Sequence, residues 1–150
     1  MADLKGLYQE AVLDHYKKPR NLRKIEHATR QAEGFNPLCG DRLVIYIKAR
    51  NGVIEDIAFA GSGCAISTAS ASMMTESLKG KTEAEAEALF ESFHQLVTNP
   101  AASQSGPESL GTLAVFAGLR GYPVRVKCAI LAWHTMLAAL RGSRETVATE

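Results

Sequence analysis

Residues 42–64 read RLVIYIKARNGVIEDIAFAGSGC and contain two runs rich in β-branched and aromatic residues. Such residues favour strands, so we predict strands over residues 42–49 and 53–60. Asn51-Gly52 lies between the two runs and is typical of a tight hairpin turn, because both turn positions must accept positive φ. The stretch therefore predicts an antiparallel hairpin around which the rest of the chain folds.

Helical periodicity predicts several helices outside this hairpin. A weaker pattern over residues 29–35 indicates a third strand, and residues 99–107 are typical of a loop. A short antiparallel sheet of about three strands packed against several helices is an α+β fold. The predicted helices span residues 3–17, Cys64 to Gly80, 83–97 (after a capping box of Thr82 and Glu85), about 110–117 and about 125–141.

The composition indicates one globular domain over residues 1–150, with a polar tail from about 142 that we expect to fray. The chain is 46% hydrophobic and 22% charged, and 17 basic and 16 acidic residues leave a net charge of +1. Such a balance provides no field that attracts nucleic acid or an anionic membrane. No apolar run reaches the roughly 18 residues of a membrane span, and the N-terminus lacks a secretory signal. We therefore expect a cytoplasmic protein with no nucleic-acid or membrane partner.

The three cysteines are the candidate reactive residues, and their odd number argues against a disulfide framework. Cys39 lies in the turn NPLCGD before the first confident strand, and Cys64 begins a predicted helix. Cys128 is expected in the first turn of the last helix. The positive end of a helix lowers the pKa of a thiol, so these positions favour thiolates over inert buried cysteines.

Asp41 follows Cys39 by two residues, and alternate residues of an extended backbone point the same way. A thiolate and a carboxylate could therefore face one ion. Three thiolates and a carboxylate suit tetrahedral Zn²⁺, and thiolates also suit iron–sulfur chemistry. The spacing of Cys39, Cys64 and Cys128 matches no zinc finger or ferredoxin pattern, so it leaves metal binding and simple packing both open.

Longer segments resemble the SufU branch of the IscU-like iron–sulfur assembly proteins. LYQEAVLDHYKKPRN (7–21) is similar to the N-terminal signature of that family. NPLCGD (36–41), GSGC (61–64) before a Ser/Ala-rich helix, and VRVKCAILAWHTM (124–136) resemble its three cysteine segments in the same order. The resemblance extends from about residue 7 to residue 140.

This resemblance implies a SufE/IscU-like α+β fold and a role in iron–sulfur cluster biogenesis. It implies that Cys39 accepts persulfide sulfur from a pyridoxal-phosphate (PLP)-dependent cysteine desulfurase of SufS type and passes it to downstream cluster-assembly proteins. It also implies a Zn²⁺ ion on Cys39, Asp41, Cys64 and Cys128, with Arg125 nearby. Such a sulfurtransferase-type carrier is not clearly an enzyme.

Two other hypotheses remain beside sulfur transfer. The same four residues could hold iron or a transient [2Fe–2S] cluster on an assembly scaffold, or a purely structural zinc ion. Lys127 stands where the IscU branch has His, and a protonated Lys is a poor metal ligand. GYPVR (121–125) replaces the chaperone-docking motif of that branch, and an additional segment is expected around residues 95–115. These departures favour sulfur transfer over the scaffold.

The four histidines have no cysteine or carboxylate partner at metal-ligand spacing. His15 and His134 lie on apolar predicted helices, where we expect them to be core residues. His27 and His94 offer no signal of their own. The same interpretation applies to Trp133 and to the methionine pair 73–74, which we expect in the core.

Overall fold

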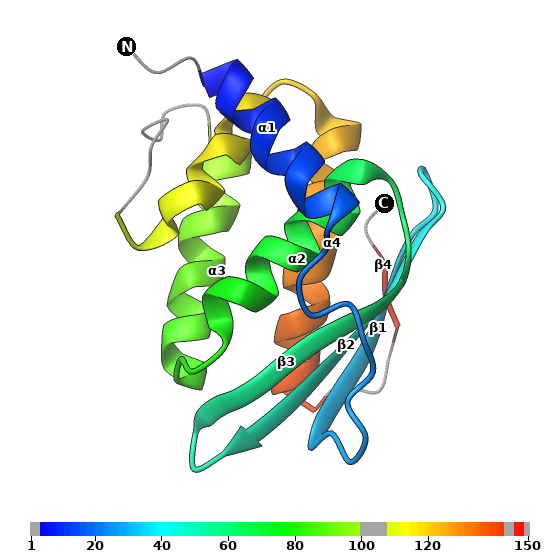
Figure 1. The fold of residues 1–150 in the computed structure, drawn as a ribbon, viewed down its shortest axis with the longest axis vertical. Helices are drawn as coiled ribbons and strands as arrows, with labels where there is room; N and C mark the ends of the chain where they lie inside the picture. The colour runs from blue at the N-terminus through cyan, green and yellow to red at the C-terminus, as the bar shows by residue number, and fades with distance from the viewer. Residues whose placement is uncertain (1–3, 100–107, 143–145, 149–150) are drawn as a thin grey trace.

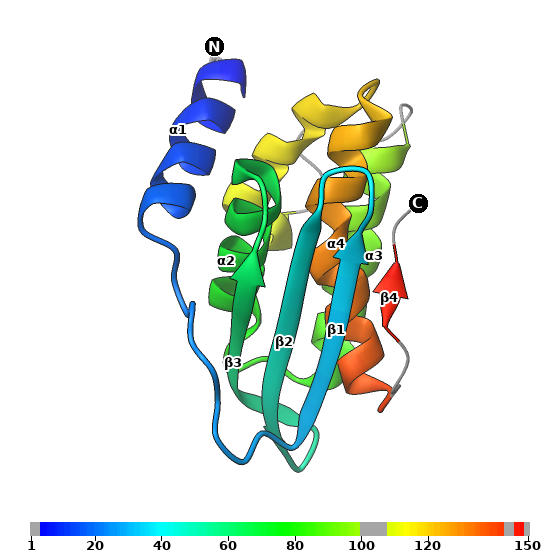
Figure 2. The same cartoon turned by 90° about the vertical axis from the view of Figure 1, so that its right-hand side faces the viewer.

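The computed structural model describes residues 4–99, 108–142 and 146–148, and it places a sheet on one side of the molecule and helices on the other (Figures 1 and 2). This arrangement is the predicted α+β fold. The elements in chain order are α1 (Leu4–Lys17), β1 (Arg30–Asn36), β2 (Asp41–Arg50), β3 (Val53–Ser62), α2 (Ala65–Leu78), α3 (Glu83–Thr98), the 3₁₀ helix η1 (Glu108–Leu119), α4 (Pro123–Leu140) and β4 (Val147–Ala148).

The sheet has the strand order β3-β2-β1-β4, and the predicted hairpin forms its β2–β3 pair. Asn51 and Gly52 take the positive φ values of the turn, 52° and 77°. Residues that alternate along β2 and β3, such as Ile45 and Ile57, are fully buried against the helices. Because successive side chains of a strand point to opposite faces, this alternation fixes which face of the sheet meets the helices.

The prediction of about three antiparallel strands needs one correction. Gly34 and Phe35 of β1 pair in parallel with Val147 and Ala148, so the sheet has a fourth, two-residue strand. Residues 147–148 belong to the tail that was expected to fray. Without the tail, β1 would be an edge strand with unpaired backbone N–H and C=O groups, and the tail strand pairs with some of these groups.

Helices α2 and α4 lie directly on the sheet, while α1 packs on α2, and α3 packs on α4 (Figure 2). Small residues let α2 and α4 approach closely, and the Ser70 hydroxyl donates to the Ala129 carbonyl at 2.6 Å. Trp133 is fully buried and stacks on Phe93, with ring centroids 4.5 Å apart. The expected core positions of Trp133 and of residues 73–74 are thus confirmed.

The helix boundaries follow the sequence signals with two differences. The capping box of Thr82 and Glu85 is present at the start of α3. The segment predicted as a helix around residues 110–117 is the 3₁₀ helix η1, with non-helical backbone at Gly111. Helix α4 begins at Pro123, because a proline at the first helical position needs no hydrogen-bond acceptor.

Two predicted segments fall partly outside the described residues. Most of the predicted loop over residues 99–107 and part of the additional segment around 95–115 are not described. None of the helices in the described ranges combines the length and the apolar character that a bilayer span requires.

Candidate metal centre

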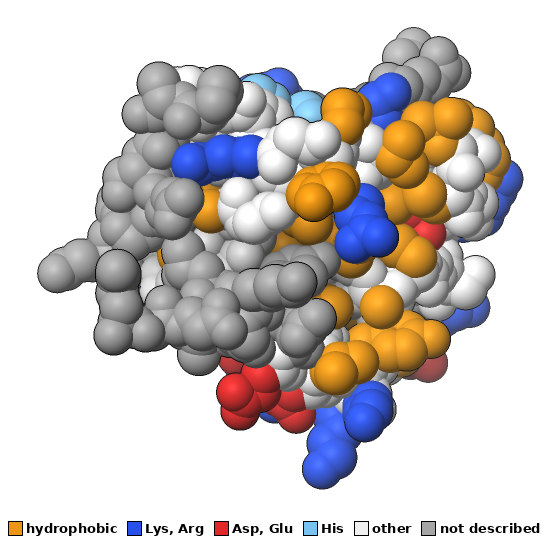
Figure 3. All heavy atoms as spheres, turned by 90° about the horizontal axis from the view of Figure 1, so that it is seen from above, with side chains coloured by type: hydrophobic (Ala, Val, Ile, Leu, Met, Phe, Trp, Pro, Cys, Tyr) orange, Lys and Arg blue, Asp and Glu red, His pale blue; other side chains and the backbone are white. Residues whose placement is uncertain are grey.

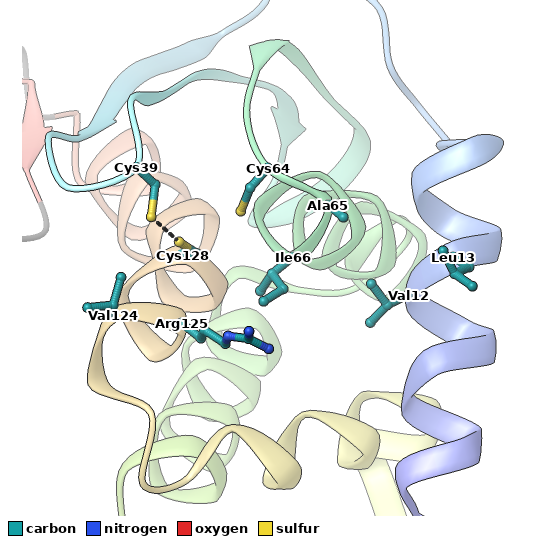
Figure 4. Close-up of a pocket in the computed structure, with 9 residues that line it drawn as sticks. All are labelled: Val12, Leu13, Cys39, Cys64, Ala65, Ile66, Val124, Arg125 and Cys128. Carbon is teal, nitrogen blue, oxygen red and sulfur yellow. Dashed lines mark hydrogen bonds between the residues drawn. The ribbon is translucent and has the colours of Figure 1, made fainter.

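Three separate segments meet at one end of the sheet and bring the cysteines together (Figure 4). Cys39 lies in the turn between β1 and β2, Cys64 caps the N-terminus of α2, and Cys128 projects from α4. The Asn36 carbonyl accepts the N–H groups of Cys39 at 3.3 Å and of Gly40 at 2.8 Å. Gly40 has a φ of 71°, which lets the chain reverse there and leaves Cys39 exposed.

The predicted ligands converge. The Sγ atoms of Cys39 and Cys128 are 3.0 Å apart, and one carboxylate oxygen of Asp41 and these two sulfur atoms all lie within 4.8 Å of one another. Cys64 is not part of this group of three, but its Sγ is 3.9 Å from Asp41 Oδ2. Two thiolate ligands of one zinc ion lie at most about 4.6 Å apart, so small side-chain movements suffice for shared contact.

A turn, and not an extended strand as predicted, brings the side chains of Cys39 and Asp41 together. The turn over residues 37–40 separates them, rather than the extended backbone assumed in the sequence argument. Asp41 is the first residue of β2, and its carboxylate is fully buried and contacts Asn36 and the backbone of Cys64. The positive φ of Gly40 folds Cys39 back over this carboxylate.

Two groups hold the Asp41 carboxylate in place. The N–H of Cys64 donates to Asp41 Oδ1 at 2.8 Å, and the side-chain amide of Asn36 donates to Oδ2 at 3.3 Å. Asn36 Nδ2 also lies 3.4 Å from Cys128 Sγ. Asn36 is fully buried. It was not predicted as a site residue from the sequence, where its only signal is its place in the segment NPLCGD.

The pKa values of the two inner thiols move in opposite directions. The pKa of Cys64 is lowered to about 7 by its hydrogen bond with Cys128 and by the N–H groups of Ser67 and Ile66. The pKa of Cys128 is raised by the same bond to Cys64, by burial and by Cys39. Cys128 was expected in the first turn of a helix that would lower its pKa, but α4 begins at Pro123 and puts it in the second turn.

The donor set fits a soft divalent metal ion. Three sulfur atoms surround a carboxylate that is fully buried, and no described Lys, Arg or His forms an ion pair with Asp41. A buried carboxylate without a cation is costly. A Zn²⁺ or Fe²⁺ ion would supply the missing positive charge, and thiolates with one carboxylate are ligands that both ions accept.

A cavity of about 720 Å³ opens onto the three cysteines between α1 and the start of α4. Arg125 lines it and places its guanidinium 5.7 Å from the centre of the Tyr122 ring. Figure 3 looks onto this end of the molecule and shows hydrophobic side chains gathered with basic side chains among them. Two exposed hydrophobic residues, Leu13 and Val124, line the cavity. Exposed Leu38 precedes its lining residue Cys39 in the chain, and exposed Tyr122 contacts its lining residue Arg125.

Comparisons with known proteins show the family of the chain. Residues 7–129 match the family described as the NifU-like N terminal domain. The chain belongs to this family. It is 39% identical over 146 residues to the "Iron-sulfur cluster assembly scaffold protein IscU" of Streptococcus pyogenes serotype M1, covering 95% of this chain and 88% of that protein. It is 36% identical over 135 residues to the "Zinc-dependent sulfurtransferase SufU" of Bacillus subtilis, covering 90% of each.

A solved structure shares the fold of this NifU-like domain. It is described as a candidate iron–sulfur cluster assembly scaffold protein for the SUF system from Fervidobacterium islandicum AW-1. The TM-score is 0.81 at 35% identity, with 90% of this chain and 97% of that chain covered. The resemblance to the IscU and SufU proteins and the α+β fold that it implied are therefore confirmed.

The described histidines do not belong to the group of candidate metal ligands. His15 is buried and its Nδ1 is 2.7 Å from the Ser72 hydroxyl, which confirms it as a satisfied core residue. His134 is half-buried, and its ring centre is 5.1 Å from that of Phe90. Among the described residues, the only group that could hold a metal ion combines two cysteines with Asp41 and includes no histidine.

Proposed function

We propose that this NifU-like domain works in iron–sulfur cluster assembly as a zinc-bound sulfur acceptor, and that Cys39 receives the sulfur. The observation that carries the proposal is the unequal exposure of three clustered thiols. Cys39 is exposed, whereas Cys64 is half-buried and Cys128 is buried. An incoming sulfur donor therefore reaches Cys39 first.

Cys39, Asp41, Cys64 and Cys128 would hold the ion. Bound Zn²⁺ would keep the thiols deprotonated at neutral pH. The protein contributes the arrangement of the ligands: Asn36 and the N–H of Cys64 orient the carboxylate. Cys64 and Cys128 are fixed by helices, and only Cys39 lies in a turn whose glycine neighbour allows movement.

The transfer step is a thiol–disulfide type exchange. The Cys39 thiolate attacks the terminal sulfur of a persulfide on the partner, and a new S–S bond forms on Cys39. The S–S bond of the partner breaks, and its cysteine leaves as a thiolate. One thiolate is consumed and one released, so the step needs no external oxidant or reductant.

The partner that fits this chemistry is a PLP-dependent cysteine desulfurase, which carries the persulfide. The cavity beside Cys39 is wide enough, at about 720 Å³, for a loop that presents such a group. Val124, which lines the cavity and has 49% of its surface accessible, and Leu38, which precedes Cys39 and has 57% accessible, offer apolar contacts. Arg125 lines the same cavity and would provide a positive charge for the anionic perthiolate that results. Downstream cluster-assembly proteins would then take the sulfur.

A scaffold role is the second candidate, because the relative from Streptococcus pyogenes has that name. The same four ligands would then carry an iron–sulfur cluster. Lys127 beside Cys128 favours sulfur transfer, since an ammonium group cannot serve as a further ligand. Anaerobic purification with metal analysis and a visible spectrum separates the two. A colourless protein with stoichiometric zinc supports transfer, and iron with bound sulfide supports the scaffold.

Desulfurase turnover tests the proposed function. The wild-type protein should raise the rate at which a cysteine desulfurase consumes cysteine, and Cys39→Ser should not, although three ligands and a water still hold zinc. Cys64→Ser is the matched comparison, because it should lose both the metal and the stimulation. Stimulation by Cys39→Ser at the wild-type level would contradict the proposal.

A further inference from the structure

One buried hydroxyl beside the centre makes no hydrogen bond. The side chain of Ser67 is completely buried, and its Oγ has no partner. Other buried hydroxyls nearby are satisfied: Ser70 donates to the Ala129 carbonyl, and Thr75 donates to the Ser72 carbonyl at 2.8 Å. A buried hydroxyl without a partner is unfavourable, so we expect a nearby group with which the Ser67 hydroxyl could form a hydrogen bond.

Ser67 lies in the first turn of α2, next to the candidate ligand Cys64. Its backbone N–H donates to Cys64 Sγ at 3.4 Å, which is the cap of the helix. A Cβ atom on Gly63 would lie 2.9 Å from Asp41 Oδ1 and 3.1 Å from Ser67 Oγ. The hydroxyl and the carboxylate oxygen therefore flank one point, and only a glycine fits between them.

The Asp41 carboxylate can accept a further hydrogen bond, from the Ser67 hydroxyl. Oδ1 accepts one hydrogen bond, from the Cys64 N–H at 2.8 Å, and a carboxylate oxygen has two lone pairs. Oδ2 is the oxygen that lies near Asn36 and 3.9 Å from Cys64 Sγ. A second donor on Oδ1 would fix the carboxylate with Oδ2 directed toward the thiols.

We propose that Ser67 is a positioning residue of the metal centre: its hydroxyl donates to Asp41 Oδ1 when the metal is bound and holds Oδ2 as the ligand oxygen. This inference rests on the metal centre of the proposed function. Ser67 acts through Asp41 and does not touch the metal. Groups that orient a ligand in this way contribute about 10- to 100-fold to metal affinity.

Ser67→Ala tests the inference, with Ser70→Ala as the matched control on the same helix. Ser70 makes two hydrogen bonds, to the Ala129 carbonyl and from the Trp133 indole N–H at 3.2 Å, so its loss should lower the melting temperature of the chelator-stripped protein. Ser67→Ala should leave that temperature unchanged or slightly raised, because it removes an unsatisfied hydroxyl.

In metal binding, by contrast, Ser67→Ala should be the impaired variant and Ser70→Ala should behave like the wild type. Competition with a chromophoric chelator should show about tenfold weaker Zn²⁺ binding for Ser67→Ala and wild-type binding for Ser70→Ala. The visible spectrum of the Co²⁺-substituted protein should shift only in Ser67→Ala, because only there does the carboxylate ligand change.

A double variant checks the route through Asp41. In an Asp41→Ala background, Ser67→Ala should not weaken zinc binding further. If Ser67→Ala binds zinc and absorbs like a zinc-binding wild type, the inference is wrong while the proposed function stands. If the wild type binds no zinc at all, the proposed function fails and the inference fails with it.

Discussion

The sulfur atoms of Cys39 and Cys128 lie 3.0 Å apart although the two residues are 89 positions apart in the chain. One sulfur belongs to an exposed turn and the other to a buried helical position. Their approach depends on the packing of α4 against β1, so the site exists only in the folded protein. Any ion bound between these segments therefore stabilises the fold as a whole.

Removal of the metal should lower the melting temperature. At a free zinc concentration a thousandfold above the dissociation constant, binding contributes about 4 kcal/mol to the free energy of unfolding. For a chain of this size that corresponds to about 10 °C. Scanning calorimetry with and without chelator measures the shift, and the Cys39→Ala/Cys128→Ala variant is the control that should show none. Equal melting of fully loaded and stripped wild type would count against the metal centre.

Asp41→Ala distinguishes transfer from scaffold. A carboxylate is a weaker zinc ligand than a thiolate, so the variant should keep zinc with lower affinity and an open fourth position. Under anaerobic reconstitution with iron and sulfide, the transfer role predicts a colourless zinc protein. A stable coloured cluster on Asp41→Ala would favour the scaffold instead.

The sequence predicted the features that local signals determine. Asn51-Gly52 indicated the hairpin, and Thr82 with Glu85 indicated the start of α3, and both are present. Cys128 was placed in the first turn because the last helix was predicted to begin at about residue 125, whereas it begins at Pro123. The tail strand was missed because a two-residue pair has no recognisable pattern.

The residues that orient the ligands could not be predicted in this way. Asn36 contacts Cys128 across 92 positions, and Ser67 and Asp41 come near each other, at Gly63, only in the folded chain. Neither arrangement is marked by a periodicity or a spacing in the chain. Cys39 and Asp41 were correctly paired by their separation of two residues, but the turn at Gly40 brings them together rather than an extended strand.

Gly63→Ala should disturb the centre from the backbone side. The added methyl group would lie 2.9 Å from Asp41 Oδ1 and 3.1 Å from Ser67 Oγ, so the carboxylate must move. We expect a loss of about 1–3 kcal/mol of stability, typical of overpacking, and weaker zinc binding. Gly118→Ala is the matched control, because nothing lies within 4 Å of its added Cβ. Unfolding in denaturant and chelator competition measure both effects, and wild-type zinc affinity in Gly63→Ala would contradict the described packing.

Acidification should destabilise the protein through His15. Burial, and then the charge of Arg20, lower the pKa of His15 below its ordinary value of 6.5. The unfolded chain therefore binds the proton first, so this contribution to stability is complete above about pH 6.5 and is lost as the pH falls below it. Melting curves between pH 5 and pH 8 should be less pH-dependent for His15→Gln than for the wild type. An unchanged pH dependence in His15→Gln would contradict this role of His15.

Mass spectrometry of the sulfur-loaded protein tests the central claim most directly. The wild-type protein is incubated anaerobically with a cysteine desulfurase and cysteine, alkylated, and digested so that Cys39, Cys64 and Cys128 fall in separate peptides. We expect one added sulfur atom, on Cys39, and none on a Cys39→Ser variant that still holds zinc. Added sulfur on Cys64 or Cys128, with Cys39 unmodified, would contradict it.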